Sequence, residues 1–485
     1  MSNAPIIVWF RRDLRVADNT ALSKAAERQQ PIIGLFVETP GQWRAHQMAP
    51  IQADLIERRL VVLRKKLNSL GIPLLVTQCD DFAATPSLVE KVCTEFNASA
   101  VLCNKEYQLN EMQRDYQVAN ALKGVGVQMQ VYDDSCILAP GTVLNGHGEP
   151  YKVFTPFRKS WLRVLNSYGA QAMPRPTPSP QFYPLQGDTQ QVEPITFASE
   201  KIPSDAYPVD DGAISSRLQQ FCDESVHQYH EKRDYPAVDG TSMLSPYLAI
   251  GALSARQCFA MLMAAAPDCI DNPKSGGFSW LNELVWREFY NHLLYAYPRL
   301  CRHQAFTPWS EAVRWEKNSA ALSAWQAGKT GYPIVDAAMR QLNETGWMHN
   351  RLRMIVASFL TKDLFIDWRQ GEAYFMSKLV DGDFAANNGG WQWAASTGTD
   401  AQPYFRIFNP TTQGKRFDPN GDFIRKWVKE LENCPETLIH EPHLWAGVGN
   451  TAYPAPIVDH GEARTIAISR FQLAKEQAVP SGSEI

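Results

Sequence analysis

The chain has 485 residues, of which 45% are apolar and 20% charged, and a formal net charge of −4 at pH 7. This composition is typical of a globular protein with two or three domains, and it argues against a protein that coats nucleic acid indiscriminately. No run of 18 apolar residues is present and the first residues lack the order of a signal peptide, so we expect a cytoplasmic protein without a membrane span. Nine cysteines with no C-x-x-C spacing indicate reduced thiols, so we expect neither disulfides nor a metal site.

The first third of the chain alternates short apolar runs with amphipathic segments. We expect buried strands at residues 6–10, 32–37, 73–77, 100–103 and 127–132. Helical spacing covers residues 52–69 and 107–123, and Thr85 followed by Pro86 is typical of an N-cap and first helical position. This repetition predicts a Rossmann-like α/β domain with a parallel sheet covered on both faces, although the G-x-G-x-x-G fingerprint of dinucleotide sites is missing.

Composition changes along the rest of the chain. Eight prolines between residues 171 and 208 indicate a surface linker, and helical periodicity with many tryptophans dominates afterwards. We expect an α/β domain at 1–135, a linker at 136–208, an all-α domain at 209–473 and a short tail at 474–485.

The stretch NNGGWQWAAS at residues 387–396 combines paired amides, paired glycines and two indoles without any charge. One interpretation is a buried turn with two core tryptophans. The other is a wall against which a large, planar and partly polar ligand lies, because glycines permit close backbone approach and indoles offer flat apolar faces.

Two further segments each place a large ring and polar groups on one side of an expected helix. The first carries Glu283, Trp286, Arg287 and Tyr290, and the second carries Trp347, Asn350, Arg351 and Met354. Either face alone fits a tryptophan that anchors a helix while its polar neighbours reach solvent. Two such faces together with NNGGWQWAAS favour a pocket that holds flat polar rings.

Two segments could contact phosphates. The hydroxyl-rich stretch TSMLS, residues 241–245, precedes an apolar helical run, where it either caps a helix or offers hydroxyl and N–H groups to a phosphate. Residues 400–429 carry a net charge of +3 directly after the tryptophan-rich stretch. Most charge clusters are solvated faces, but this position favours a nucleic-acid contact.

At this point the chain resembles a known family. The motifs are WFRRDLRVADN, EKRDYPAVDGTSMLS, WLNELVWREFY, GKTGYPIVDAAMRQLNETGWMHNRLRM and DGDFAANNGGWQWAASTGTDAQPYFRIFNP. They resemble the photolyase/cryptochrome family, and within it the bacterial class I cyclobutane pyrimidine dimer photolyases, over about residues 1–470. The resemblance implies light-driven DNA repair, in which excited reduced FAD, as FADH⁻, gives an electron to a dimer flipped out of damaged DNA.

The resemblance also implies an FAD site in the helical domain. Its residues would be Tyr229, Thr241, Ser242, Met243, Leu244, Ser245, Trp280, Asn350, Arg353, Asp381, Asp383 and Asn387. Asp383 would accept a hydrogen bond from the flavin ring, Arg353 would pair with Asp381, and the Asn387 amide would face N5 without adding charge. Met243 stands where many relatives have arginine, which weakens the case for a charged phosphate clamp there. Gly389 and Gly390 would let the backbone turn between Asn387 and Trp393.

The same resemblance implies how DNA would bind. Glu283, Asn350 and Met354 would act with Asn387 in the catalytic pocket, and Trp286 and Trp393 would stack on the splayed thymines. Glu283, if protonated, would donate to thymine carbonyls. The remaining DNA contacts would come from Arg233, Arg287, Arg351, Arg406, Gln413, Lys415 and Arg416. We expect a monomer that associates with the nucleoid during repair.

Two accessory sites are implied as well. Trp391, Trp368 and Trp315 would relay an electron to resting flavin, although each alone is more often a core tryptophan. His46, Asn110, Glu111, Cys301 and Arg302 would hold an antenna pigment, for which 5,10-methenyltetrahydrofolate is our first choice. Arg302 replaces the lysine usual in folate binders, and a deazaflavin or FMN are the alternatives.

The leading alternative function is a cryptochrome-type blue-light photoreceptor. Asn387 in place of aspartate, the dimer-pocket residues Glu283, Trp286 and Met354, and the short tail argue against it. Repair of six-four photoproducts would need pocket histidines beyond His349, and a generic flavin oxidoreductase would need a nicotinamide fingerprint that is not present.

Overall fold

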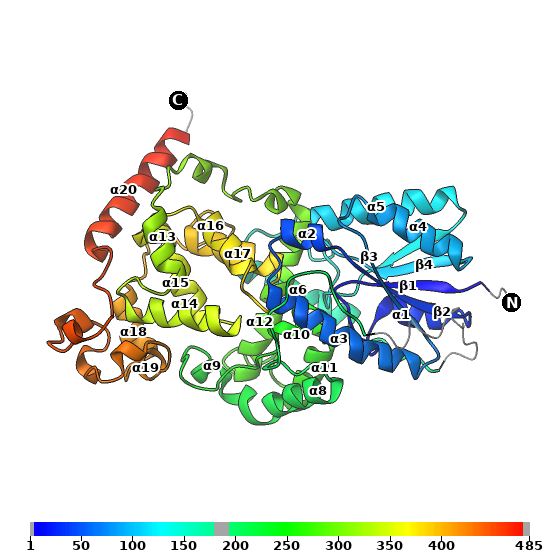
Figure 1. Ribbon diagram of the computed structural model, residues 1–485, viewed down its shortest axis with the longest axis horizontal. Coiled ribbons are helices and arrows are strands. Elements are labelled where there is room, and N and C mark those ends of the chain that lie inside the picture. Colours follow the sequence, from blue (N-terminus) through cyan, green and yellow to red (C-terminus); the bar gives the residue numbers. More distant parts are fainter. Residues whose placement is uncertain (1–3, 179–193, 479–485) are drawn as a thin grey trace. The chain divides into compact units, whose positions relative to one another are not determined.

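The computed structural model describes residues 4–178 and 194–478 (Figure 1). The chain divides into two compact units. The first unit comprises Met1–His227, Ser242–Cys301 and Val380–Gly382, and the second comprises Gln228–Thr241, Arg302–Leu379 and Asp383–Ile485. The domain boundaries expected at residues 135, 208 and 473 stay predictions, and the expected linker prolines at 180 and 184 and tail residues 479–485 lie outside the described residues.

A five-stranded parallel sheet forms the centre of the first unit. Its strands are β1 Ile6–Phe10, β2 Ile32–Glu38, β3 Leu74–Gln78, β4 Ala100–Asn104 and β5 Gln128–Tyr132, in the order β3-β2-β1-β4-β5. Ile6 of the central strand pairs with Ile32 on one side and Ala100 on the other. β1, β2 and β4 are buried throughout, as expected for strands covered on both faces, so the predicted α/β sheet is confirmed.

Helices cover both faces of this sheet. Figure 1 shows α1 and α3 on one face and α4 and α5 on the other. Their bounds are α1 Thr20–Ala26, α3 Pro50–Asn68, α4 Thr85–Glu95 and α5 Leu109–Gly124, and a short α2 spans Pro40–Ala45. The Thr85 N-cap prediction is wrong by one residue: Ala84 is the N-cap, and the Thr85 hydroxyl donates to the Asp81 carbonyl from inside the first turn.

The rest of the first unit is helical. It contains α6 Phe154–Tyr168, α8 Asp211–Gln220, α10 Ser245–Ala249, α11 Ala255–Ala265 and α12 Gly276–Ala296. The helix α6 lies within the stretch expected to be linker. It packs on α12, where Glu288 is fully buried and accepts a hydrogen bond from the Trp161 indole at 2.6 Å. Burial raises the pKa of Glu288 to about 7.

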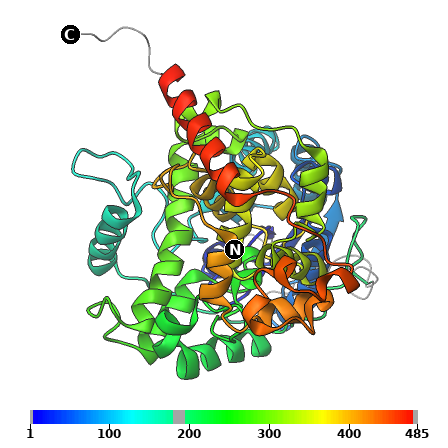
Figure 2. The same ribbon diagram turned by 90° about the vertical axis from the view of Figure 1, so that its left-hand side faces the viewer.

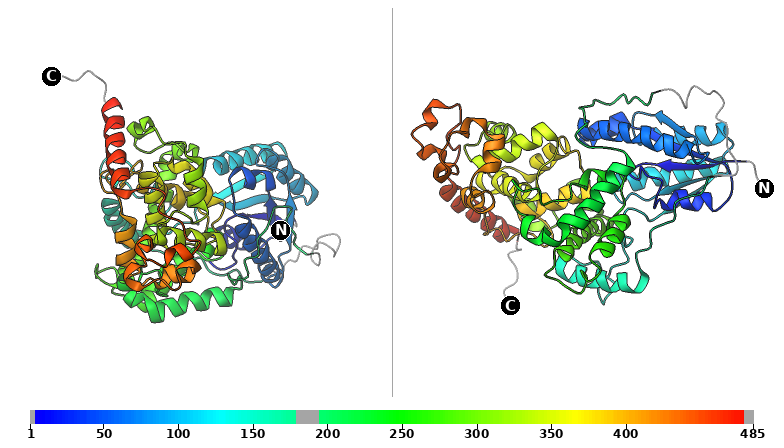
Figure 3. Two further views of the ribbon diagram at one scale, coloured as in Figure 1. Left: turned by 60° about the vertical axis from the view of Figure 1, so that its left-hand side comes forward. Right: turned by 90° about the horizontal axis from the view of Figure 1, so that it is seen from below.

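The second unit is all helical, with the bounds α9 Tyr229–Lys232, α13 Ser319–Gln326, α14 Pro333–Thr345, α15 Asn350–Ser358, α16 Trp368–Met376, α17 Phe384–Ala395, α18 Pro410–Phe417, α19 Asp422–Trp427 and α20 His460–Ala478. A π-helical turn, η5, spans Phe359–Asp363 after α15. Helix α15 packs on α14 and α17, and α17 on α16 (Figure 3). The last helix α20, red in Figure 2, lies against η5 and the short helix η4 at Pro308–Ala312.

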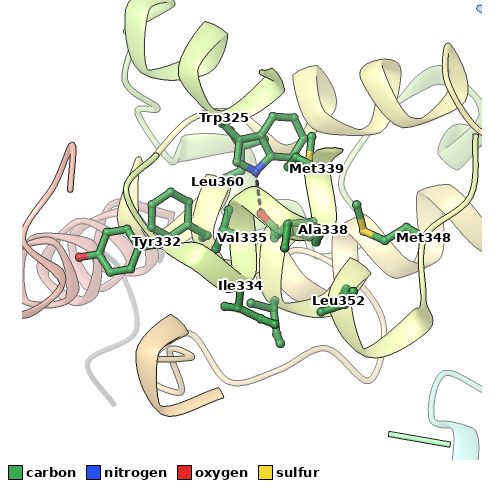
Figure 4. Packing of buried hydrophobic residues seen from close by; sticks show 14 of the residues in the cluster. Trp325, Tyr332, Ile334, Val335, Ala338, Met339, Met348, Leu352 and Leu360 are labelled. Atoms are coloured by element: carbon green, nitrogen blue, oxygen red, sulfur yellow. Dashed lines mark hydrogen bonds between the residues drawn. The ribbon is translucent and has the colours of Figure 1, made fainter. Parts of the chain in front are cut away.

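The core of the second unit is built around Trp325 (Figure 4). This indole is fully buried, and its Nε1 donates to the Val356 carbonyl at 3.1 Å, so the only polar atom of the ring is satisfied. Met339, Leu342 and Leu352 fill the space around it. This packing fixes α14 and α15 and therefore the residues that α15 presents.

Three findings concern the described residues as a whole. No helix there is long and apolar enough to cross a membrane. No group of three or more His, Cys, Asp or Glu side chains in that part of the chain is arranged to hold a metal ion. All nine cysteines are free thiols.

Candidate functional site

The stretch NNGGWQWAAS is helical and not a turn. Residues Phe384–Ala395 form α17, and Ser396 ends it in the left-handed region at φ 62°. The expectation that Gly389 and Gly390 turn the backbone is therefore wrong. The helix is stabilised at its N-terminus, where the Asp383 carboxylate accepts a hydrogen bond from the Ala386 N–H at 2.9 Å. A Cβ placed at Gly390 would meet no protein atom within 4 Å, so packing does not demand glycine there.

The two asparagines of α17 are both tied to Glu372 of α16. The Asn387 amide donates to the Glu372 backbone carbonyl at 3.0 Å, and the Asn388 amide donates to the Glu372 carboxylate at 2.9 Å. The hydrogen bond of its NH₂ group to α16 orients the Asn387 amide. An amide oxygen held in one orientation can accept a hydrogen bond from a ring N–H without adding charge.

Glu372 is almost completely buried, and its carboxylate also lies 2.8 Å from Nδ1 of His303. The hydrogen bond to this carboxylate raises the pKa of His303. His303 and Asn388 each bind one oxygen of this buried side chain, so both of its oxygens have a hydrogen-bond partner. Sequence reasoning did not identify His303 or Glu372, since neither occurs in a pattern that predicts their pairing.

Helix α15 presents the second polar face. It begins at Asn350, and its N-cap is His349, whose Nδ1 accepts from the Arg351 N–H at 3.1 Å. Burial lowers the pKa of His349 to about 4, so this imidazole is neutral at pH 7. The Arg353 side chain donates through Nε to the Met348 carbonyl at 2.8 Å. Asp381 is buried in the first unit, and its expected pairing with Arg353 stays a prediction.

Three of the arginines expected at DNA come together in the second unit. Arg351 donates through Nη2 to the Asp234 carboxylate at 2.7 Å, and Nε of Arg233 lies 4.0 Å from the same oxygen. The guanidiniums of Arg351 and Arg416 lie 4.5 and 5.0 Å from the centre of the Phe417 ring. We call Arg233, Arg351 and Arg416, with Asp234 between the first two, the arginine cluster.

The other basic and polar residues expected at DNA are distributed as follows. Lys415 lies on α18 next to Arg416 and pairs with Glu441 at 2.5 Å, while Arg406 is exposed and Gln413 is partly exposed. Arg287 belongs to the first unit, where its guanidinium donates to the Ser135 carbonyl at 2.7 Å. That contact ties α12 to the segment after β5, which is a structural use of Arg287.

The face of α12 predicted from its spacing is present in the first unit. Glu283, Trp286 and Tyr290 are all partly buried. Trp286 stacks face to face on Phe154 of α6, with ring centres 3.6 Å apart and planes 5° from parallel. One face of this indole is therefore covered by protein, and the stack fixes its plane. Six residues earlier on the same helix, Trp280 packs against Phe221, with ring centres 5.0 Å apart.

The TSMLS stretch leads into α10 without capping it. Leu244 is the N-cap, no side chain caps the helix, and Met243 has a left-handed backbone at φ 51°. The helix-capping interpretation of these hydroxyls is wrong. Ser242 is partly buried and Ser245 exposed, and Thr241 and Tyr229 belong to the second unit.

The three relay tryptophans all lie in the second unit. Trp391 and Trp368 are buried, whereas Trp315 is partly exposed and packs on Phe365 and Phe471. Trp391 lies so close to α16 that a Cβ at Gly371 would come within 2.1 Å of its ring. Trp393, two residues on, is partly buried at the same helix.

The residues expected at the antenna site, except Arg302, share the first unit and form one cluster. Asn110 Nδ2 lies 2.9 Å from His46 Nε2, and Glu111 lies 3.5 Å from His46 Nδ1. Burial, reinforced by the charge of Glu106, raises the pKa of Glu111 to about 7. Burial also raises the pKa of Cys301 to about 11, with the charge of Glu111 contributing.

Comparison with known proteins identifies the class to which this geometry belongs. Residues 6–181 match the family model "DNA photolyase", and residues 280–473 match "FAD binding domain of DNA photolyase". The chain belongs to the DNA photolyase family, and its helical part is an FAD-binding domain.

Individual relatives make the assignment more specific. The chain is 50% identical to the deoxyribodipyrimidine photo-lyase of Escherichia coli K12 over 475 residues, covering 97% of this chain and 99% of that protein. Its structure is similar to a class III photolyase from Agrobacterium tumefaciens, with a TM-score of 0.85, 34% identity and 98% of each chain covered. It is also similar to a Sulfolobus tokodaii photolyase described with two FAD molecules, with a TM-score of 0.80, 30% identity, and coverage of 97% and 100%.

Proposed function

We propose that this protein repairs cyclobutane pyrimidine dimers in DNA with the residues described above, as a light-driven carbon–carbon lyase. Its likeness to deoxyribodipyrimidine photo-lyases over nearly the whole chain, at 48–50% identity, supports this activity over the cryptochrome alternative. The observation that carries the residue assignment is α17. This helix holds the oriented Asn387 amide, the buried Trp391 and the partly buried Trp393 within two turns.

In this proposal the chain's residues bind and orient FAD. Reduced FAD, when bound and excited by light, supplies one electron to the dimer and receives it back after the ring opens. Asn387 presents its side-chain oxygen to the ring N–H, because its NH₂ group is held by Glu372. Asp383 lies at the N-terminus of α17, which one of its carboxylate oxygens caps, and the hydroxyls of Ser242 and Ser245 are not used to cap α10. These features fit the isoalloxazine ring and the pyrophosphate of FAD.

The lesion would be held by stacking and hydrogen bonding. Trp286 is pre-oriented by Phe154, so little side-chain entropy is lost when a base stacks on its other face. Trp393 would take the second base, while Asn350 and Met354 would complete the pocket wall. Glu283, if protonated, would donate a hydrogen bond to the thymine carbonyls, where negative charge develops as the electron arrives.

The relay would restore the active redox state. Trp391 would give an electron to the light-excited flavin, Trp368 would refill Trp391, and Trp315 would refill Trp368. Two such transfers and one proton from water would be needed to convert oxidised FAD to FADH⁻. A partly exposed Trp315 can lose its proton to water and accept an electron from an external reductant such as a thiol. Trp391 and Trp368 are buried and cannot exchange protons or electrons with the solvent directly, so electrons would enter the relay at Trp315.

The antenna cluster would bind 5,10-methenyltetrahydrofolate. Asn110 and Glu111 offer an amide and a carboxylate beside His46, and these groups suit the amino and ring N–H groups of a pterin. The Sulfolobus tokodaii relative is described with a second FAD, so a flavin is the alternative to test. Extraction of the purified protein's chromophores, with identification by absorbance and mass, separates the two.

The experiment that tests the proposed function uses purified protein with reduced FAD and a thymine-dimer oligonucleotide. Blue light should restore the thymines, and a dark sample should not. Trp286→Ala should weaken binding of dimer DNA and leave the flavin spectrum unchanged. Trp347→Ala is a control for loss of an indole, because Trp347 lies before the first residue of α15, off the helix face on which it was expected, and is not among the proposed pocket residues. We expect a cytoplasmic monomer, measurable by light scattering with and without DNA.

A further inference from the structure

The arginine cluster contains a carboxylate that DNA binding alone does not explain. Asp234 follows Arg233 in the segment after α9, and its side chain is about one-third exposed. One carboxylate oxygen accepts two hydrogen bonds from Arg351, from Nη2 at 2.7 Å and from Nε at 3.2 Å. A surface built only to attract phosphates would place no negative charge between two of its arginines.

The ion pair fixes which edge of the Arg351 guanidinium faces outward. Nε and Nη2 are used by Asp234, and the ring of Phe417 lies against the guanidinium, with its centre 4.5 Å from Cζ. The remaining nitrogen, Nη1, lies 3.7 Å from the sulfur of Met354, one turn along α15. Arg351 is therefore held with Nη1 donating toward the sulfur of Met354, and its side chain is only 17% exposed.

From this geometry we propose that Asp234 is a specificity determinant for damaged DNA. This inference rests on the proposed function, in which Met354 lines the lesion pocket and Arg351 contacts the DNA. Asp234 repels the phosphates of any DNA strand that reaches Arg233, Arg351 and Arg416. It also keeps Arg351 turned toward the position of the flipped dimer, so only dimer-containing DNA gains a contact that offsets the repulsion.

Removal of the Asp234 charge should therefore change the affinity for undamaged DNA and for dimer-containing DNA differently. In Asp234→Asn the amide keeps the size of the side chain but removes the repulsion and weakens the hold on Arg351. Undamaged DNA should bind about two- to five-fold tighter at low salt, the range expected for one partly exposed charge. Dimer DNA should bind no tighter, so the ratio of the two affinities falls by the same factor.

Asp422→Asn is the matched control. Asp422 is an exposed carboxylate in the first turn of α19 and lies in the basic stretch 400–429. Its replacement by asparagine changes the net charge of the protein by the same amount as Asp234→Asn. Because Asp422 does not orient an arginine of the cluster, its loss should shift both affinities by one common factor. The comparison therefore separates the effect of position from that of overall charge.

The test is fluorescence anisotropy in the dark, with the FAD-loaded protein and one oligonucleotide with and without a thymine dimer, across a salt series. The flavin spectrum and circular dichroism check that each variant is folded. A lower affinity ratio for Asp234→Asn but not for Asp422→Asn supports the inference. Equal shifts for both DNAs in Asp234→Asn, or tighter binding of dimer DNA, overturn it. If the wild-type protein fails to prefer dimer DNA, the proposed function itself is wrong.

Discussion

Gly371 allows Trp391 to pack directly against the backbone of α16, and we expect alanine there to disrupt the relay. A Cβ at this position would lie 2.1 and 2.4 Å from two carbons of the Trp391 ring and 2.6 Å from Cδ2 of Leu360. Carbon atoms rest at about 3.5 Å or more, so α16 and the indole would have to separate by roughly 1 Å. Trp391 is only 2% exposed and is bounded by Phe375 and Trp325, which leave little room to move.

The expected change in the free energy of unfolding of Gly371→Ala is the sum of two opposing effects. Overpacking a rigid core costs up to about 3 kcal/mol. Replacing a helical glycine with alanine recovers about 1 kcal/mol of helix propensity. Gly371→Ala should therefore lower the free energy of unfolding by about 2 kcal/mol, measured by urea denaturation followed by tryptophan fluorescence. The displaced indole should also slow flavin photoreduction, measured by absorbance during illumination.

Gly390→Ala is the control, because it makes the same change in a helix where the new methyl group meets no protein atom. It should be neutral or stabilising by up to about 1 kcal/mol. If Gly371→Ala proves as stable as Gly390→Ala and photoreduces at the wild-type rate, the packing argument for Gly371 is refuted.

Three other predictions concern single side chains. The hydrogen bond to Glu372 raises the pKa of His303, so its stabilising contribution is complete below the unfolded-state pKa of about 6.5 and is lost as pH rises through the higher folded-state value. His303→Ala should flatten the dependence of stability on pH between 5 and 9, and an unchanged profile would contradict the pairing. Burial raises the pKa of Glu111 to about 7, so antenna binding through its carboxylate should strengthen as pH rises through 7, and Glu111→Gln should abolish that dependence in chromophore titrations. Trp391→Phe should retain bound FAD but lose photoreduction under illumination, and a normal rate would remove Trp391 from the relay.

The sheet could be predicted closely from sequence because its signal is local. Each strand is a short apolar run, and the observed bounds differ from the expected ones by a single residue at most at either end. The N-cap of α4 is Ala84, one residue before the expected Thr85, because a Thr-Pro pair fits either of two adjacent positions at the start of a helix. What fixes the position is a bond from the Thr85 hydroxyl to the Asp81 carbonyl, which the preceding loop supplies.

The site was harder to predict because its determinants are far apart in the sequence. Asp234 and Arg351 are 117 residues apart, and Asn110 and His46 are 64 apart. Neither pair has a spacing that predicts contact, and only the family resemblance indicated that some of these residues act together. Phe154, Glu372 and Gly371 belong to no motif that would have identified them. Their roles follow from what they touch.

Helix α17 shows why local rules failed at NNGGWQWAAS. Two adjacent glycines disfavour a helix by about 2 kcal/mol relative to alanine, so a turn was a reasonable expectation. The helix forms because Asp383 caps it and because Glu372 binds both asparagines from α16. The amides of Asn387 and Asn388 make different contacts. Asn388 is buried and connects Glu372 to Gln392, whereas Asn387 is anchored by its NH₂ group and keeps its oxygen for a ligand. The stretch carries no charge of its own, and the groups that bind its two amides, the backbone carbonyl and the side chain of Glu372, come from α16.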